Sequence, residues 1–93
     1  MDEELLQAEH FNPHVGKMFK FNGTPFAIPL DHIGSNRRRL PKGALIFRAP
    51  REQVYMTEGL YECEVEGGPT FSLYVAPIQT LQREFQDYQA AFN

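Results

Sequence analysis

Apolar and polar residues alternate along most of the chain after residue 18. The clearest case is a pair of segments with an apolar residue at every second position: Tyr61, Cys63 and Val65, then Phe71, Leu73 and Val75. A period of two puts these side chains on one face of a strand and their polar neighbours on the other. Because Gly67-Gly68-Pro69 lies between the segments, the pattern predicts an antiparallel hairpin with one face in the core.

A second hairpin is predicted nearer the N-terminus. Phe19 and Phe21 alternate with polar or flexible residues and lead into Asn22-Gly23, a strong two-residue turn signal. The segment from Thr24 to Ile33 follows with its own period of two. It also contains two prolines, which cannot donate a backbone hydrogen bond, so we expect this strand to lie at an edge or to be bulged: Pro25 and Pro29.

Four further elements are predicted. Residues 2–11 are expected to form a short helix and residues 35–43 a solvated loop, while residues 44–48 form a central strand and residues 85–92 a C-terminal strand. Pro13 is expected to stop the helix, and Pro50 to stop the central strand. Residues 81–91 would also tolerate a helix, so the last element is left as strand or helix.

These elements predict an all-β fold. A chain of 93 residues with 42% hydrophobic residues suits one domain with one core. We expect a single domain over residues 1–93, with 1–14 as a helical or irregular N-terminal segment and 15–93 as the body. A small antiparallel meander buries one face and removes its edges by curling, so we predict a barrel or roll with a short N-terminal helix.

The charges are sorted along the chain. Residues 10–51 hold eight of the nine Lys and Arg residues against one acid, Asp31, whereas residues 52–93 hold Arg83 against seven acids. The net charge of −3 therefore conceals a polarised molecule. A charge distribution of this kind bears on which partners a protein binds and in what orientation, and it gives no indication of catalysis.

One basic cluster is the candidate partner-binding site: Arg37, Arg38, Arg39, Lys42, Arg48 and Arg51. A run of this kind is typical of a solvated loop, of an element that docks onto an acidic patch of a protein or of a second copy, or of a nucleic-acid site. The acidic pI of about 5.5 and the absence of Phe or Tyr within the basic loop argue against nucleic acid. In the version with a second copy, the basic loop would meet the row of Glu62, Glu64 and Glu66.

No group of residues demands a reaction. His10 and His14 have the spacing of two metal ligands, but Pro13 lies between them and no further ligands complete a shell. Asp31-His32 is expected in a solvated turn, and Cys63 as a small buried hydrophobe. We therefore predict no catalytic residue, metal or cofactor, and a protein that is not an enzyme. A ligand-binding barrel with a pocket among Tyr55, Tyr74 and His32 is kept as a further alternative.

The N-terminus and the cysteine content bear on location. Met1-Asp2-Glu3-Glu4 is acidic where a signal peptide would be basic, the single cysteine excludes an internal disulfide, and no apolar stretch reaches the roughly 20 residues of a membrane span. We expect a cytoplasmic protein that does not enter a membrane.

The apolar strand and turn residues resemble those of a known family from about Phe11 onward: Phe11, Val15-Gly16, Phe19, Ile46 to Pro50, Gly59-Leu60-Tyr61, Phe71 to Pro77 and Tyr88 to Asn93. The chain looks like a family of small bacterial domains of unknown function, often encoded near proteins that resemble phage tail-collar fibres. The resemblance supplies no catalytic residue. It implies an accessory or assembly role, with a tail-fibre-like protein as a partner. We therefore expect a non-catalytic protein interaction module.

Overall fold

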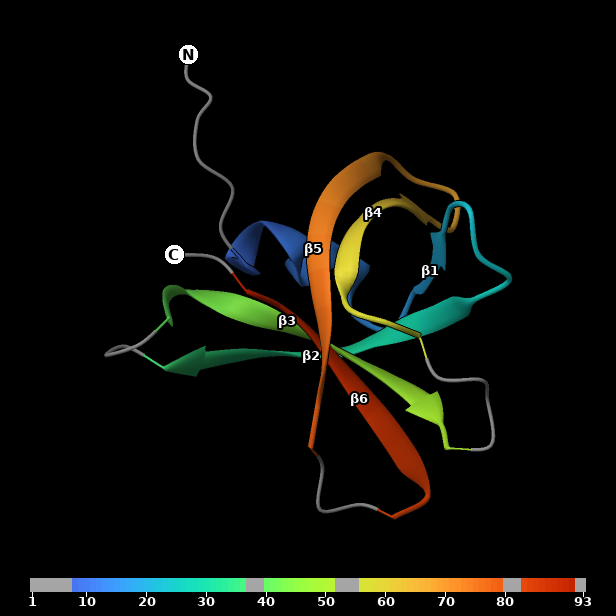
Figure 1. Cartoon of the computed structure of the whole chain (residues 1–93). Coiled ribbons are helices and arrows are strands. Elements are labelled where there is room, and N and C mark those ends of the chain that lie inside the picture. Colours follow the sequence, from blue (N-terminus) through green and yellow to red (C-terminus); the bar gives the residue numbers. More distant parts are fainter. Residues whose placement is uncertain (1–7, 37–39, 52–55, 80–82, 92–93) are drawn as a thin grey trace.

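The chain folds as a closed six-stranded barrel. The computed structural model describes residues 8–36, 40–51, 56–79 and 83–91. A short 3-10 helix precedes six strands: η1 (Ala8–His14), β1 (Met18–Phe21), β2 (Ala27–Asn36), β3 (Leu40–Pro50), β4 (Gly59–Val65), β5 (Thr70–Ile78) and β6 (Phe85–Ala91). All paired strands are antiparallel (Figure 1). The predicted all-β barrel is confirmed.

The strand order departs from a single meander. Around the barrel it runs β1-β2-β3-β6-β5-β4, so two three-stranded meanders are joined by the pairs β3–β6 and β1–β4. The expectation that hairpins would join all strands in sequence order is wrong between β3 and β4. The physical reason is closure, because pairing β1 with β4 and β3 with β6 leaves neither meander with a free edge.

The β4–β5 hairpin has the predicted register. Cys63 lies opposite Phe71, and Tyr61 lies opposite Leu73. Four of the six predicted inward residues are at most 3% exposed, and the other two, Tyr61 and Phe71, are half-buried against the same core. The three glutamates of β4 and its turn are exposed, so the apolar face is in the core as predicted.

The second strand is bulged, as its prolines suggested. Leu30 pairs with Phe47, and the next pair is His32 with Ile46, so Asp31 is an extra residue on β2. The alternative, an edge position, does not occur because β2 lies between β1 and β3 in a closed barrel.

Two predicted boundaries need correction, and one open alternative is decided. The segment 35–43, expected to be a loop, belongs to strands up to Asn36 and from Leu40 onward, since pairing of β2 with β3 continues to those two residues. The central strand extends to Pro50, because β3 pairs with β6 along its second half. The segment from Phe85 is a strand, which decides between the two alternatives for the C-terminus.

The N-terminal helix also differs from the prediction. It is a 3-10 helix that includes Pro13 rather than stopping before it. A helix of two turns loses few hydrogen bonds to a proline, so Pro13 is tolerated. Residues 1–7, which hold most of the predicted helix, lie outside the described residues.

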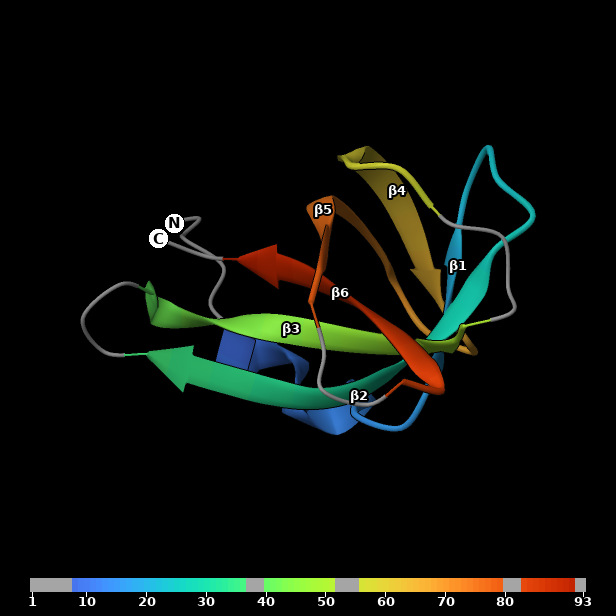
Figure 2. The same cartoon turned by 60° about the horizontal axis from the view of Figure 1, so that its bottom comes forward.

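Aromatic side chains fill the barrel. Phe47 is in edge contact with Phe19 at 5.0 Å and with Phe21 at 5.4 Å between ring centroids. Phe11 of η1 is fully buried and lies 4.5 Å from Phe71, so η1 closes the barrel interior while it packs against β2 and β3 (Figure 2). The side chains that the structure describes in the barrel interior therefore form a packed core.

Candidate functional site

The predicted basic cluster is not one compact surface among the described residues. Arg37, Arg38 and Arg39 lie outside the described residues, and of Lys42 only the backbone, in β3, is described. Arg48 lies on the same strand, six residues further along, which in extended backbone is roughly 20 Å. The structure therefore separates Lys42 from Arg48 and Arg51.

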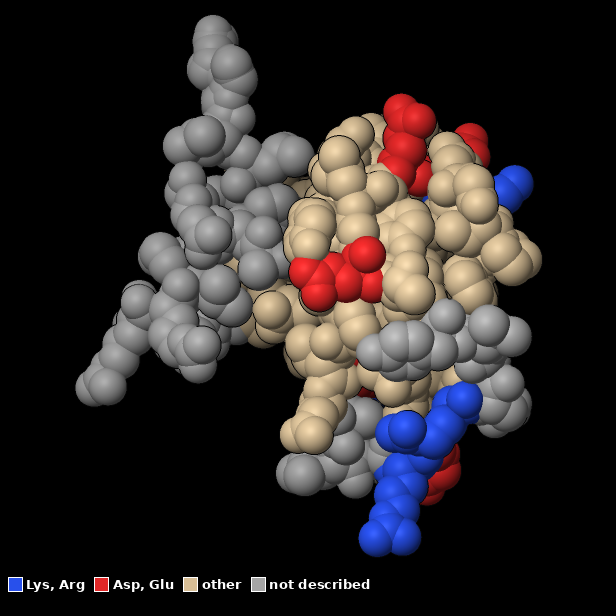
Figure 3. Space-filling model, viewed as in Figure 1, with Lys and Arg blue, Asp and Glu red and all other residues tan. Residues whose placement is uncertain are grey.

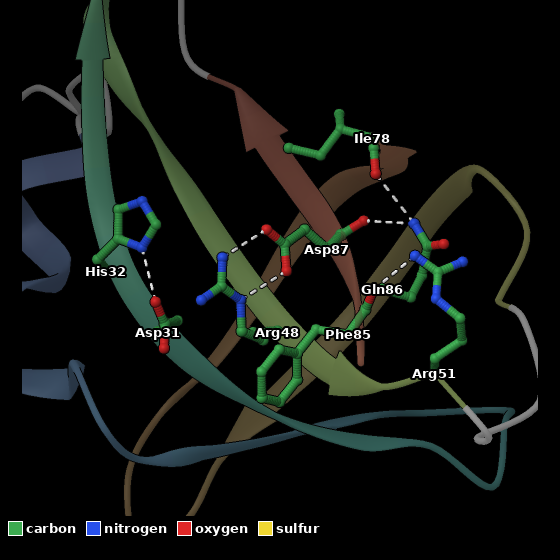
Figure 4. Close-up of polar contacts among 8 residues, drawn as sticks. All are labelled: Asp31, His32, Arg48, Arg51, Ile78, Phe85, Gln86 and Asp87. Carbon is green, nitrogen blue, oxygen red and sulfur yellow. Dashed lines mark hydrogen bonds and ion pairs between the residues drawn. The ribbon is translucent and has the colours of Figure 1, made fainter. Parts of the chain in front are cut away.

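The side chain of Arg48 is held by hydrogen bonds to the neighbouring strand β6. Its Nε and Nη2 donate to Oδ1 and Oδ2 of Asp87 at 2.8 and 2.9 Å, and its guanidinium lies 5.2 Å from the centre of the Phe85 ring (Figure 4). The Asp87 side chain is only 6% exposed. These hydrogen bonds raise the pKa of Arg48. Arg48 thus joins β3 to β6 rather than standing free for a partner.

Arg51 also has an internal role. Its Nε donates to the Arg83 carbonyl at 2.7 Å and its Nη2 to the Phe85 carbonyl at 2.8 Å, while its backbone N–H donates to the backbone carbonyl of Glu84. These bonds hold the end of β3 against the start of β6. Its charge remains exposed at this end of the molecule.

Asp31 and His32 lie on the outer side of β2 rather than in a turn. The bulge at Asp31 brings both side chains outward, where His32 Nδ1 lies 2.8 Å from Asp31 Oδ2 (Figure 4). Both side chains are substantially exposed, at 52% and 41%. The exposure of both side chains leaves the imidazole in contact with solvent, which gives no support to an acid–base site.

An exposed apolar pair lies on the outer side of β4 and β5. Leu60 and Tyr74 are opposite each other in the register and are 72% and 55% exposed. The Tyr74 hydroxyl donates to the Glu58 carboxylate, a contact that raises the pKa of Tyr74. Sequence analysis missed this pair, although the signal was present: Leu60 is an apolar residue on the outward, otherwise acidic, positions of β4.

Three glutamates continue the same outer side toward the turn. Glu62, Glu64 and Glu66 are exposed at alternate positions of β4 and just beyond it. We call Leu60, Tyr74 and these three glutamates the β4 face. In Figure 3 acidic side chains lie on the upper part and in the middle of the visible side, and the largest group of basic side chains lies at the bottom with an acidic side chain beside it.

A groove of about 500 Å³ adjoins the β4 face. Met18 and Lys20 of β1 line one side, and residues 64–68 line the other. Lys20 is directly opposite Glu64 in the β1–β4 register, and Met18 is 41% exposed. The groove thus combines an exposed thioether with two carboxylates and one ammonium group.

The described residues offer little for redox or metal chemistry. Cys63 is fully buried, and burial raises the pKa of its thiol to about 12, so it stays protonated. Within the described ranges no three His, Cys, Asp or Glu side chains gather as metal ligands would. His10 and His14 both lie on η1.

The pocket proposed among Tyr55, Tyr74 and His32 receives no support. Tyr55 lies outside the described residues, and β3 and β6 lie between the strands of His32 and Tyr74.

The described part of the chain contains no helix with the length and apolar character needed to span a membrane.

Comparison with known proteins gives a family and nothing more specific. No curated protein and no solved structure matches the chain significantly. A family model described as a domain of unknown function, DUF6916, matches residues 6–92. Since this is nearly the whole sequence, the chain belongs to the DUF6916 family.

Proposed function

We propose that this chain is a non-catalytic protein interaction module that binds its partner through the β4 face. The observation that carries the proposal is the cross-strand pair Leu60 and Tyr74, which are 72% and 55% exposed beside a row of glutamates. Large apolar and aromatic side chains that stay exposed in a small domain mark interaction sites more often than isolated polar ones do. The core does not need them, because the barrel interior is already filled.

The two parts of the β4 face have different roles in this proposal. Tyr and neighbouring apolar side chains supply affinity at the centre of an interface, where they are removed from water. Charges at the rim, here Glu62, Glu64 and Glu66, set orientation and association rate. A partner with a basic patch around an apolar pocket fits this arrangement.

The partner is proposed to be a tail-fibre-like protein, with this chain as an accessory or assembly factor of a bacterial, phage-tail-like structure. The resemblance described from the sequence supports this choice. The basic residues Arg37, Arg38, Arg39 and Lys42 remain a second proposed contact on sequence grounds. Arg48 and Arg51 are better suited to holding β3 and β6 together, because their guanidinium groups are already engaged.

The test measures binding of the purified chain to a tail-collar-like protein encoded beside its gene, by biolayer interferometry. We expect binding that Leu60→Ser with Tyr74→Ser weakens by at least about tenfold, since the loss of two central side chains costs more than about 1.4 kcal/mol. Val15→Ser, at another exposed apolar residue, is the matched control and should bind like the wild type.

Two results would overturn the proposal. One is equal binding by the double variant and the wild type. The other is binding of a single-stranded oligonucleotide instead of the protein. If this binding is lost when Arg37, Arg38 and Arg39 are changed to Ser, the result favours a nucleic-acid-binding barrel.

A further inference from the structure

The groove beside the β4 face lies far from the place where β2 ends and β3 begins. Figures 1 and 2 show the end of β2 and the start of β3 at one end of the molecule in both views, and β1 with the end of β4 at the other. The longest extent of the molecule is 42 Å. The two features therefore belong to different ends of one elongated barrel.

The groove has the chemistry of a receptor for basic side chains. Glu64 and Glu66 place two carboxylates against the single ammonium of Lys20, and Glu62 adds a third carboxylate further along β4. Exposed Met18 offers a polarisable apolar surface on which the stem of an arginine or lysine can lie. A carboxylate pair suits a guanidinium in particular, because its planar donors match carboxylate oxygens.

The sequence of this chain supplies a complementary element. Arg37, Arg38 and Arg39 join Asn36 of β2 to Leu40 of β3, which are paired with each other. Three residues span at most about 11 Å even when fully extended. The segment therefore cannot reach the groove of its own copy, and only a second copy can bring it there.

We infer that this chain associates head to tail with itself, the Arg37–Arg39 segment of one copy docking in the Met18, Lys20, Glu64 and Glu66 groove of the next. The inference rests on the proposed function, which it deepens by naming a second copy as a partner. The groove lies at the other end of the molecule from the strand ends that flank residues 37–39. Each contact between two copies therefore leaves one groove and one basic segment unused. Such heterologous contacts produce open chains or, where the rotation closes, rings.

The test is sedimentation velocity of the full chain over a range of concentrations at low and high ionic strength. We expect the wild type to form species larger than dimers at low ionic strength and to return toward monomer at high ionic strength, where exposed charges are screened. Glu64→Gln with Glu66→Gln should weaken association by at least about tenfold. Glu84→Lys changes the net charge by the same two units outside the groove and is the matched control. Lys20→Gln should strengthen association.

Mixing variants gives the sharpest test. The groove variant, with Glu64→Gln and Glu66→Gln, keeps a working basic segment, and the variant with Arg37, Arg38 and Arg39 changed to Ser keeps a working groove. Each alone should be monomeric, whereas an equal mixture should form 1:1 dimers and nothing larger. Thermal melts check that both variants remain folded.

Three results would overturn the inference: a wild type that is monomeric at every concentration at low ionic strength, a Glu84→Lys variant as weak as the groove variant, or a mixture that stays monomeric. If the partner-binding test with Leu60 and Tyr74 succeeds while self-association fails, only this inference falls, since neither residue lines the groove. If both fail, the proposed function falls as well.

Discussion

Arg48 of β3 and Asp87 of β6 face each other in the register and form a two-point ion pair at 2.8 and 2.9 Å. The two strands are the neighbours that join one three-stranded meander to the other. A residue that looked like part of a binding cluster therefore helps to close the barrel.

Removing Arg48 should destabilise the fold. Arg48→Ala removes two hydrogen-bond donors from the carboxylate of Asp87, which is 6% exposed, and breaking a largely buried ion pair of this kind costs roughly 2 to 4 kcal/mol. Urea unfolding followed by circular dichroism measures the loss. Arg51→Ala, at an exposed arginine, is the control and should cost less. Equal losses of stability in the two variants would show that the Arg48–Asp87 ion pair stabilises the fold no more than the exposed Arg51 does.

The three arginines at 37–39 should behave in the opposite way. The sequence predicts a solvated loop for these residues, and charges in such a loop contribute little to folding, so the triple change to Ser should alter the free energy of unfolding by less than about 0.5 kcal/mol. A thermal melt beside Arg48→Ser, which should lower the melting temperature, provides the comparison. A large loss of stability in the triple variant would mean that these residues hold the fold together.

Phe47 should be among the most costly core positions. Its side chain is fully buried and in edge contact with two other phenylalanines, so Phe47→Ala should destabilise by about 3 to 5 kcal/mol. Phe71→Ala should cost less, because Phe71 is only half-buried. Chemical denaturation of the two variants side by side gives the ranking, and the reverse order would contradict the core assignment.

Cys63 should react slowly in the native state and make stability fall at alkaline pH. Burial raises its pKa from 9.0 to about 12, so the unfolded chain loses this proton first as pH rises. The contribution of the protonated Cys63 thiol to the free energy of unfolding is therefore intact below pH 9. It declines between pH 9 and 12, by at most about 1.4 kcal/mol per pH unit. Reaction with a disulfide reagent at pH 8, with and without urea, tests accessibility. Unfolding of Cys63→Ala from pH 8 to 11 should lack this part of the pH dependence, and an identical slope would refute the assignment.

Local patterns predicted the hairpins but not the way they close. The alternation around Gly67 and the Asn22-Gly23 turn were sufficient for two strand pairs, because each depends on residues close in sequence. The β3–β6 pairing was not predictable in the same way: Arg48 and Asp87 are 39 residues apart, and no turn connects them. Charge alone grouped Arg48 with Lys42, although the six residues of strand between them separate the two positions.

The candidate surface was predictable only in part. The outward glutamates of β4 followed from the period of two, and they are exposed. The sequence did not single out Leu60 and assigned Tyr74 only to a pocket with Tyr55 and His32, since exposure of an apolar side chain depends on which strands cover it. Their opposition across β4 and β5 required the register.

Site-specific photo-crosslinking tests the central claim, that the β4 face binds a protein, most directly. A photoreactive amino acid at position 60 should form a defined adduct with one protein in the cells that produce this chain, and Glu62→Gln with Glu64→Gln should reduce its rate of formation because the steering charge is lost. The same group at Asn12, an exposed residue on η1, is the control and should not form that adduct. Adducts of the same identity and yield from positions 60 and 12, or none from position 60, would contradict the account.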